Sequence, residues 1–81
     1  MRVENSAAVI QALLAAPEAV RRAFFKQIGL LQNNLRHPSL RAKKYDEANN
    51  IWQARVTNSW RFYFTIVGDT YRILKLIPHP Q

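Results

Sequence analysis

Apolar and polar side chains alternate in the last third of the chain, and this alternation predicts strands. In residues 51–57 and 60–66 the apolar side chains fall mainly on even-numbered positions and the polar ones on odd-numbered positions. Because successive side chains of a strand point to opposite faces, the two runs predict a sheet with one apolar face. The opposite face carries Arg55, Arg61 and Tyr63. Such a sheet needs a cover on its apolar side, and its cationic side favours an anionic partner.

The turn between these two runs decides which side chains share a face. A regular two-residue hairpin at Asn58-Ser59 would place Arg55 on the same face as Phe62. Strand register follows the hydrophobic pattern, so a register that mixes charge into the apolar face is disfavoured. We therefore predict a loop of odd length or a β-bulge, either of which places Arg55 beside Arg61.

A third strand is predicted over residues 71–77. It follows a turn signal at Gly68-Asp69. Its positions are apolar on both parities, a pattern that is typical of a central strand buried on both faces. Lys75 interrupts one of these parities and is assigned to the cationic face.

The first half of the chain repeats its apolar residues at helical spacing. Residues 7–15 predict a first helix with Ser6 as its N-cap. Pro17 closes this helix and opens a second one, because proline suits the first helical turn. The second helix carries a continuous apolar stripe from Val20 to Leu35. The two helices form a hairpin whose apolar side can cover the sheet.

Together these elements predict an α+β fold in a single domain that spans residues 1–81. An N-terminal helical hairpin packs on one face of a small, mostly antiparallel sheet of three or four strands. Residues 2–4 are expected to form a short edge strand, and residues 35–50 a loop or an extended segment.

The charge of the chain is strongly unbalanced. Twelve Lys and Arg residues face five Asp and Glu residues, for a net charge of +7, and the basic residues cluster after Leu35. This balance favours RNA, DNA or an acidic protein as partner; the alternative is that the charge serves only solubility.

Other functional classes find little support in the composition. The chain has no cysteine, and His37 and His79 lie far apart, so we expect neither a metal site nor a cofactor. No apolar run approaches the roughly 20 residues that a membrane span needs, so no membrane association is expected. The lack of cysteine suits the cytoplasm.

Several motifs follow one another in a recognisable order. They are the helical hairpin, His37-Pro38-Ser39-Leu40, Lys43-Lys44-Tyr45, Ile51-Trp52-Gln53-Ala54-Arg55-Val56, Trp60-Arg61-Phe62-Tyr63-Phe64, and Tyr71-Arg72-Ile73-Leu74 leading to Ile77-Pro78-His79-Pro80. In this order they resemble the RelE/ParE superfamily of bacterial type II toxins over nearly the whole chain. The resemblance implies a RelE-like fold and a toxin that an acidic antitoxin neutralises.

The two branches of this superfamily imply different activities. Members of the RelE branch bind mRNA in the ribosomal decoding site and cleave it without a cofactor. Members of the ParE branch act on DNA gyrase and cut no RNA. A catalytically degenerate relative that only binds nucleic acid, and a generic basic RNA-binding module, are further alternatives. We expect the ribosome-dependent endoribonuclease.

Cleavage of RNA requires a deprotonated 2′-OH, a stabilised phosphate and a protonated leaving oxygen. By resemblance, Arg61 matches the arginine that would bind the scissile phosphate. Arg55 matches a neighbouring cationic position, and His79 lies near a terminal residue with the role of general acid. Gln53 stands where ribosome-dependent members carry lysine, and this difference weakens the case for cleavage.

Further residues are expected to contact nucleic acid. They are Arg41, Lys43, Lys44, Gln53, Tyr63 and Lys75. Structural roles compete with these functional ones: Arg61 as an ion-pair partner, Arg55 as a solvated strand residue and His79 as a surface turn residue. Tyr63 falls on the cationic side, where it could stack on a base. Trp52 and Trp60 fall on the apolar parity and are assigned to the core.

Overall fold

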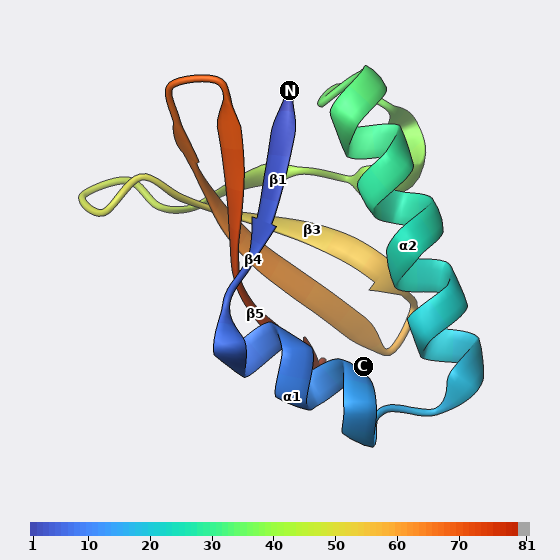
Figure 1. Cartoon of the computed structure of the whole chain (residues 1–81). Helices are drawn as coiled ribbons and strands as arrows, with labels where there is room; N and C mark the ends of the chain where they lie inside the picture. The colour runs from blue at the N-terminus through green and yellow to red at the C-terminus, as the bar shows by residue number, and fades with distance from the viewer. Residues whose placement is uncertain (80–81) are drawn as a thin grey trace.

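The computed structural model describes residues 1–79 of the chain, as two helices packed against a five-stranded sheet (Figure 1). The elements follow in the order β1 (Arg2–Asn5), α1 (Ala7–Ala15), α2 (Glu18–Asn33), a 3₁₀ turn η1 (Pro38–Leu40), β2 (Lys43–Asp46), β3 (Ile51–Thr57), β4 (Trp60–Val67) and β5 (Thr70–Pro78).

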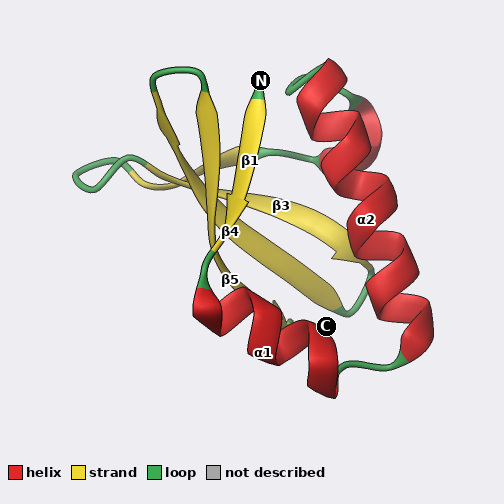
Figure 2. Cartoon of the chain, viewed as in Figure 1, coloured by secondary structure: helices red, strands yellow, loops and turns green. Residues whose placement is uncertain are grey.

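The sheet has the strand order β1-β5-β4-β3-β2 (Figure 2). Strand β1 pairs with β5 in parallel, and every other pair is antiparallel. The predicted α+β class and helical hairpin are therefore confirmed, and so is the short edge strand at the N-terminus. The sheet has one strand more than the upper limit expected, because part of the segment 35–50 pairs with β3 as β2.

Side chains fix both ends of helix α1. The Ser6 hydroxyl accepts from the backbone N–H of Val9 (3.2 Å) and donates to the carbonyl of Leu74 in β5 (2.9 Å). Ser6 is thus the predicted N-cap, and it also ties the start of α1 to the sheet. At the other end of α1, the Arg21 guanidinium donates to the carbonyl of Ala16, where a cation complements the helix dipole.

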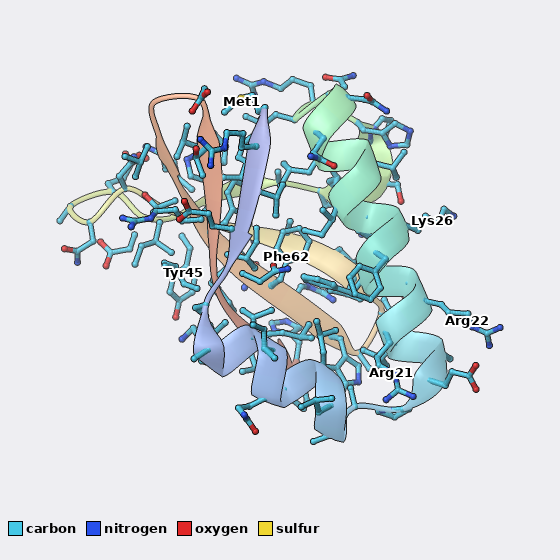
Figure 3. The ribbon with its side chains drawn as sticks, viewed as in Figure 1. Met1, Arg21, Arg22, Lys26, Tyr45 and Phe62 are labelled. Atoms are coloured by element: carbon cyan, nitrogen blue, oxygen red, sulfur yellow. The ribbon has the colours of Figure 1, made fainter. Side chains whose placement is uncertain are left out.

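The core lies between the helices and the even-numbered side chains of β3 and β4. Phe24 of α2 meets Phe62 of β4 edge to face, with ring centroids 5.7 Å apart. Figure 3 shows Phe62 in the space between sheet and helices. Trp52 stacks on Phe64 at 6.1 Å, and Trp60 also packs against this core. The assignment of both tryptophans to the core is confirmed.

A bulge in β3 sets the register of the two arginines. Thr57 faces Trp60 across a two-residue turn, and the register then shifts so that Arg55 lies directly opposite Arg61. Val56 is the extra residue. This arrangement confirms the bulge, one of the two predicted solutions, and keeps the two charges on one face.

Two further register shifts were not anticipated: one lies in β2, between Lys44 and Asp46, and the other lies in β5. Tyr63 pairs with Lys75 and Phe64 pairs with Ile73, so Leu74 is the extra residue. Strand β5 lies inside the sheet, between β1 and β4, as predicted, but it is not buried on both faces, because Lys75 is exposed and Ile77 is 37% exposed. The bulge allows both Ile73 and Leu76 to face the core.

Within residues 1–79, the structure contains no helix that could cross a membrane. Neither α1 nor α2 combines the length and the apolar character that a bilayer crossing requires.

Candidate nucleic-acid interface

A cationic hollow opens beside β2, β3 and the turn between β3 and β4. It has a volume of about 650 Å³. Its lining residues are Arg41, Lys43, Lys44, Tyr45, Gln53, Arg55, Arg61 and His79. All the predicted site residues except Tyr63 and Lys75 are therefore brought together here. Arg55 and Arg61 alternate with core residues along their strands, so they lie on the sheet face opposite the helices. We call this face the open face.

Arg61 is held over the β3–β4 turn by backbone carbonyls. Its Nη1 donates to the carbonyls of Thr57 (2.6 Å), Trp60 (3.0 Å) and Asn58 (3.4 Å). Desolvation lowers the pKa of Arg61, and the neighbouring charge of Arg55 lowers it further. An arginine nevertheless stays protonated at neutral pH. The hollow therefore contains a positioned guanidinium beside a second positive charge.

No carboxylate neutralises this pair within residues 1–79. The ion pairs of that part of the chain are Lys44–Glu47, at 3.7 Å, and Arg72–Glu4, at 3.3 Å. Neither involves Arg55 or Arg61, so the alternative reading of Arg61 as an ion-pair partner finds no partner there. Like charges directly opposite each other in a sheet are destabilising, and no carboxylate among residues 1–79 pairs with either arginine to offset this cost.

His79 is fixed next to the arginines by its backbone. Its N–H donates to the carbonyl of Ser59 in the β3–β4 turn, at 2.6 Å. The residue is half-buried and borders the hollow. The structure thus brings together the three residues predicted to act on the phosphate, from β3, β4 and the segment after β5.

Gln53 and Tyr63 form a buried pair on the open face. The Gln53 amide donates to the Tyr63 hydroxyl at 2.7 Å. Tyr63 is only 4% exposed. Its ring is covered by Tyr45, at 4.9 Å between centroids, and by the Lys75 ammonium, at 4.7 Å. A base needs an open ring face to stack, so this burial argues against the stacking role predicted for Tyr63.

Three basic residues lie in β2 or just before it, and their side chains point in different directions. Lys43 lies opposite Gln53 and shares the open face. Lys44 has the other parity: its ammonium lies 5.3 Å from the centre of the Trp52 ring and pairs with Glu47. Arg41 is exposed and adopts a left-handed backbone conformation, with φ of 46°, at the end of η1. The Lys44 ammonium therefore already has two partners within the protein, the Trp52 ring and the Glu47 carboxylate.

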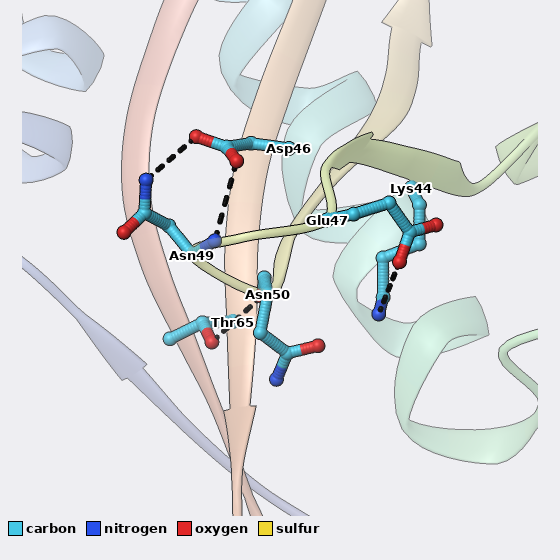
Figure 4. A network of polar contacts seen from close by, with 6 residues as sticks. All are labelled: Lys44, Asp46, Glu47, Asn49, Asn50 and Thr65. Atoms are coloured by element: carbon cyan, nitrogen blue, oxygen red, sulfur yellow. Dashed lines mark hydrogen bonds and ion pairs between the residues drawn. The ribbon is translucent and has the colours of Figure 1, made fainter.

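The β2–β3 turn is held by a local polar network (Figure 4). The Asp46 carboxylate accepts from the side-chain amide (2.8 Å) and the backbone N–H (3.2 Å) of Asn49. These two hydrogen bonds lower the pKa of Asp46. The Thr65 hydroxyl donates to the carbonyl of Asn50 at 2.9 Å and ties the turn to β4. The network orients β2, and with it Lys43 and Tyr45.

Gln27 of α2 supports the site from beneath, and the sequence reasoning missed it. Its buried amide donates to the carbonyls of Arg55 (2.7 Å) and Ser39 (3.2 Å). A signal was present, because Gln27 lies three residues after Phe24 and four before Leu31, on the apolar stripe of the helix. A polar residue at such a position needs a hydrogen-bond partner, and here the partner is the strand that carries Arg55.

Tyr45 was also missed as a member of the site. Its spacing of two residues from Lys43 was the available signal, because it predicts that both point to one face of a strand. Among residues 1–79, no group of three His, Cys, Asp or Glu side chains could hold a metal ion.

Comparison with known proteins gives a structural likeness only. No protein-family model matches the chain, and neither does any curated protein sequence. Among solved structures, a chain of the archaeal RelE–RelB complex from Pyrococcus horikoshii OT3 matches with a TM-score of 0.80 and 23% identity, covering 95% of this chain and 92% of that one.

Two further toxins give the same result. The YoeB/ParE toxin from Agrobacterium tumefaciens matches with a TM-score of 0.82 and 10% identity, covering 99% of this chain and 100% of that one. YafQ from E. coli strain BL21(DE3) matches with a TM-score of 0.74 and 14% identity, covering 98% and 94%. These neighbours are toxins of the RelE/ParE superfamily, and they confirm the predicted RelE-like fold.

Proposed function

We propose that this chain is the toxin of a type II toxin–antitoxin pair and that it cleaves mRNA at the ribosome. The observation that carries the proposal is the placement of Arg55 directly opposite Arg61 without a carboxylate partner in residues 1–79. Two adjacent guanidinium groups repel each other, and a phosphodiester between them removes that repulsion with charge-assisted hydrogen bonds.

Different residues of the hollow have different roles in the proposed cleavage of RNA. Arg61 and Arg55 bind the scissile phosphate and stabilise the charge that develops on it during attack by the 2′-OH. His79 lies at the same hollow; an imidazole can exchange a proton with the attacking or the leaving oxygen near neutral pH. The ribosome would supply the alignment of the mRNA that this small open face does not provide by itself.

An acidic antitoxin fits the same surface. The cations of the hollow are an attractive site for an acidic protein segment, and such a segment would exclude RNA from it. One of the structural neighbours comes from a RelE–RelB complex, which supports an antitoxin as partner of this chain.

The proposal is tested by inducing expression of the chain and mapping mRNA 5′ ends. We expect growth arrest and new 5′ ends within translated codons. Arg61→Ala should lower cleavage at least about 100-fold, because it removes a preorganised charge at the phosphate. Arg22→Ala is the matched control: it removes the same charge from an exposed position on α2 and should keep full activity.

Growth arrest by a folded Arg61→Ala protein would remove Arg61 from the mechanism. Circular dichroism of both variants establishes that they fold. Arrest by the unmodified chain without any new mRNA ends would contradict RNA cleavage.

Gln53 favours a second candidate function, inhibition of DNA gyrase. This neutral, buried side chain is already bonded to Tyr63 and offers no charge to an RNA cleavage site. In that case the hollow would bind an acidic protein surface. A gyrase supercoiling assay with the purified chain, run beside the mRNA mapping, separates the two functions.

A further inference from the structure

Tyr45 is an exposed aromatic residue at the rim of the cationic hollow. It is 59% exposed and lines the hollow together with Arg55 and Arg61. Figure 3 shows it on the side of the sheet away from α2. Exposure of a large aromatic surface to water is unfavourable in the free protein, so its position raises the question of what covers it.

The ring of Tyr45 rests on a rigid base. It meets Tyr63 at 4.9 Å with an interplanar angle of 73°. Tyr63 is in turn fixed by its hydrogen bond from Gln53 and by the Lys75 ammonium. An edge-to-face contact leaves ring surface free, and the exposure of Tyr45 agrees with this. The result is an oriented aromatic platform that is ready before a ligand arrives.

The cations around this platform define its ligand. Lys43 shares the open face two residues away on β2, while Arg55 and Arg61 border the same hollow. A strand of RNA presents phosphates to such cations and an unpaired base to the ring between them. Paired bases in a duplex have no free face to offer, so the ligand must be single-stranded at this position.

We propose that Tyr45 is the base platform of the site and stacks one unpaired base of a single-stranded RNA whose phosphate lies between Arg55 and Arg61. This inference rests on the proposed function and assigns it a substrate contact. Stacking on a ring tolerates every base. Tyr45 therefore positions the strand and does not read its sequence.

The test measures binding of a fluorescently labelled hexanucleotide made of 2′-O-methyl RNA, which cannot be cleaved, at low salt. The same strand is also made with a single abasic residue, moved through each position in turn. The wild-type chain is expected to bind one abasic strand about 10-fold more weakly than the intact strand, in the range found for one base–aromatic stack.

The Tyr45→Ala variant should bind the intact strand about 10-fold more weakly and should not distinguish it from the abasic strand. Tyr45→Phe should behave as wild type, because the ring is kept. The matched control is Phe25→Ala, which removes an aromatic residue of similar exposure, 58%, from α2. It should leave both affinities unchanged. Circular dichroism confirms that each variant is folded.

Two outcomes separate this inference from the proposed function. If Tyr45→Ala equals wild type on both strands while Arg61→Ala loses affinity, the base platform is overturned and the phosphate site stands. If Tyr45→Ala weakens binding and Arg61→Ala does not, the platform stands and the assigned role of Arg61 falls. Equal binding by all variants would overturn both.

Discussion

The two faces of β3 and β4 have opposite effects on the stability of the fold. On the helix side, Phe62 and Phe64 are fully buried and pack against one another, and Phe62 also packs against Phe24. On the open face, Arg55 lies opposite Arg61 and both stay partly exposed. The first face stabilises the fold by removing apolar area from water, whereas the second costs stability until an anion arrives. The same two strands therefore carry apolar core residues on one face and like charges on the other.

The largest expected effect is on the buried face. Phe62→Ala should lower the free energy of unfolding by about 3–5 kcal/mol, because it removes a fully buried ring and leaves a cavity. A chain of this size has a free energy of unfolding of roughly 4–12 kcal/mol. A large fraction of the variant molecules should therefore be unfolded at a moderate urea concentration. Urea denaturation followed by tryptophan fluorescence measures it. Phe25→Ala, at an exposed position, should cost less than about 1 kcal/mol; equal losses would contradict the assignment of the core.

The next effect concerns the link between the two faces. Gln27→Ala should lower the free energy of unfolding by about 1–3 kcal/mol, because the carbonyl of Arg55 loses its buried donor. The affinity for RNA should fall as well, since that donor positions the strand segment of Arg55. The control is Gln32→Ala, which removes an exposed amide of the same helix and should change neither quantity. An unchanged RNA affinity in the Gln27 variant would show that the faces are independent.

A smaller effect of opposite sign is expected on the open face. Arg55→Gln should raise the free energy of unfolding by about 0.2–1 kcal/mol at low salt, because it ends the repulsion with Arg61. The gain should shrink at 1 M salt, where charges are screened over about 3 Å. RNA affinity should fall at the same time. A loss of stability at low salt would show that Arg55 has a structural role that its position does not reveal.

The smallest effect is the pH dependence of the β2–β3 turn. The hydrogen bonds from Asn49 lower the pKa of Asp46, so the folded state favours the carboxylate. The resulting stability is present above the pKa of the unfolded chain, near 4, and is lost as the pH falls through the lower pKa of the folded state. Asp46→Asn should therefore lower the urea midpoint slightly at pH 7 and leave it unchanged in strong acid. A difference that persists in acid would point to another cause.

The sequence predicts the buried face well because burial imposes a period on the chain. Helix α1 has the predicted bounds, and the bulge at Val56 follows from keeping charge away from Phe62. The bulge at Leu74 escapes the same reasoning, because Ile73, Leu74 and Leu76 are apolar in either register. Strand β2 escapes as well: its side chains are mostly charged, and it forms by pairing with the free edge of β3, a contact that local sequence does not encode.

The candidate site shows the same division. The hydrophobic pattern requires the bulge at Val56, and this bulge places Arg55 beside Arg61. The burial of Tyr63 beneath the exposed Tyr45 was not predictable, because it depends on which ring packs beneath the other across strands. Gln27 was within reach of the sequence reasoning, since it interrupts an apolar stripe, but its partner on β3 is set by tertiary packing.

The pairing of β1 with β5 has a consequence during synthesis. Strand β1 can pair with β5 only after residues 70–78 have been translated. The Ser6–Leu74 hydrogen bond joins residues that are almost as far apart in the sequence. Contacts that join distant parts of a chain form late and slowly. The sheet of the nascent polypeptide therefore stays incomplete until β5 has been synthesised.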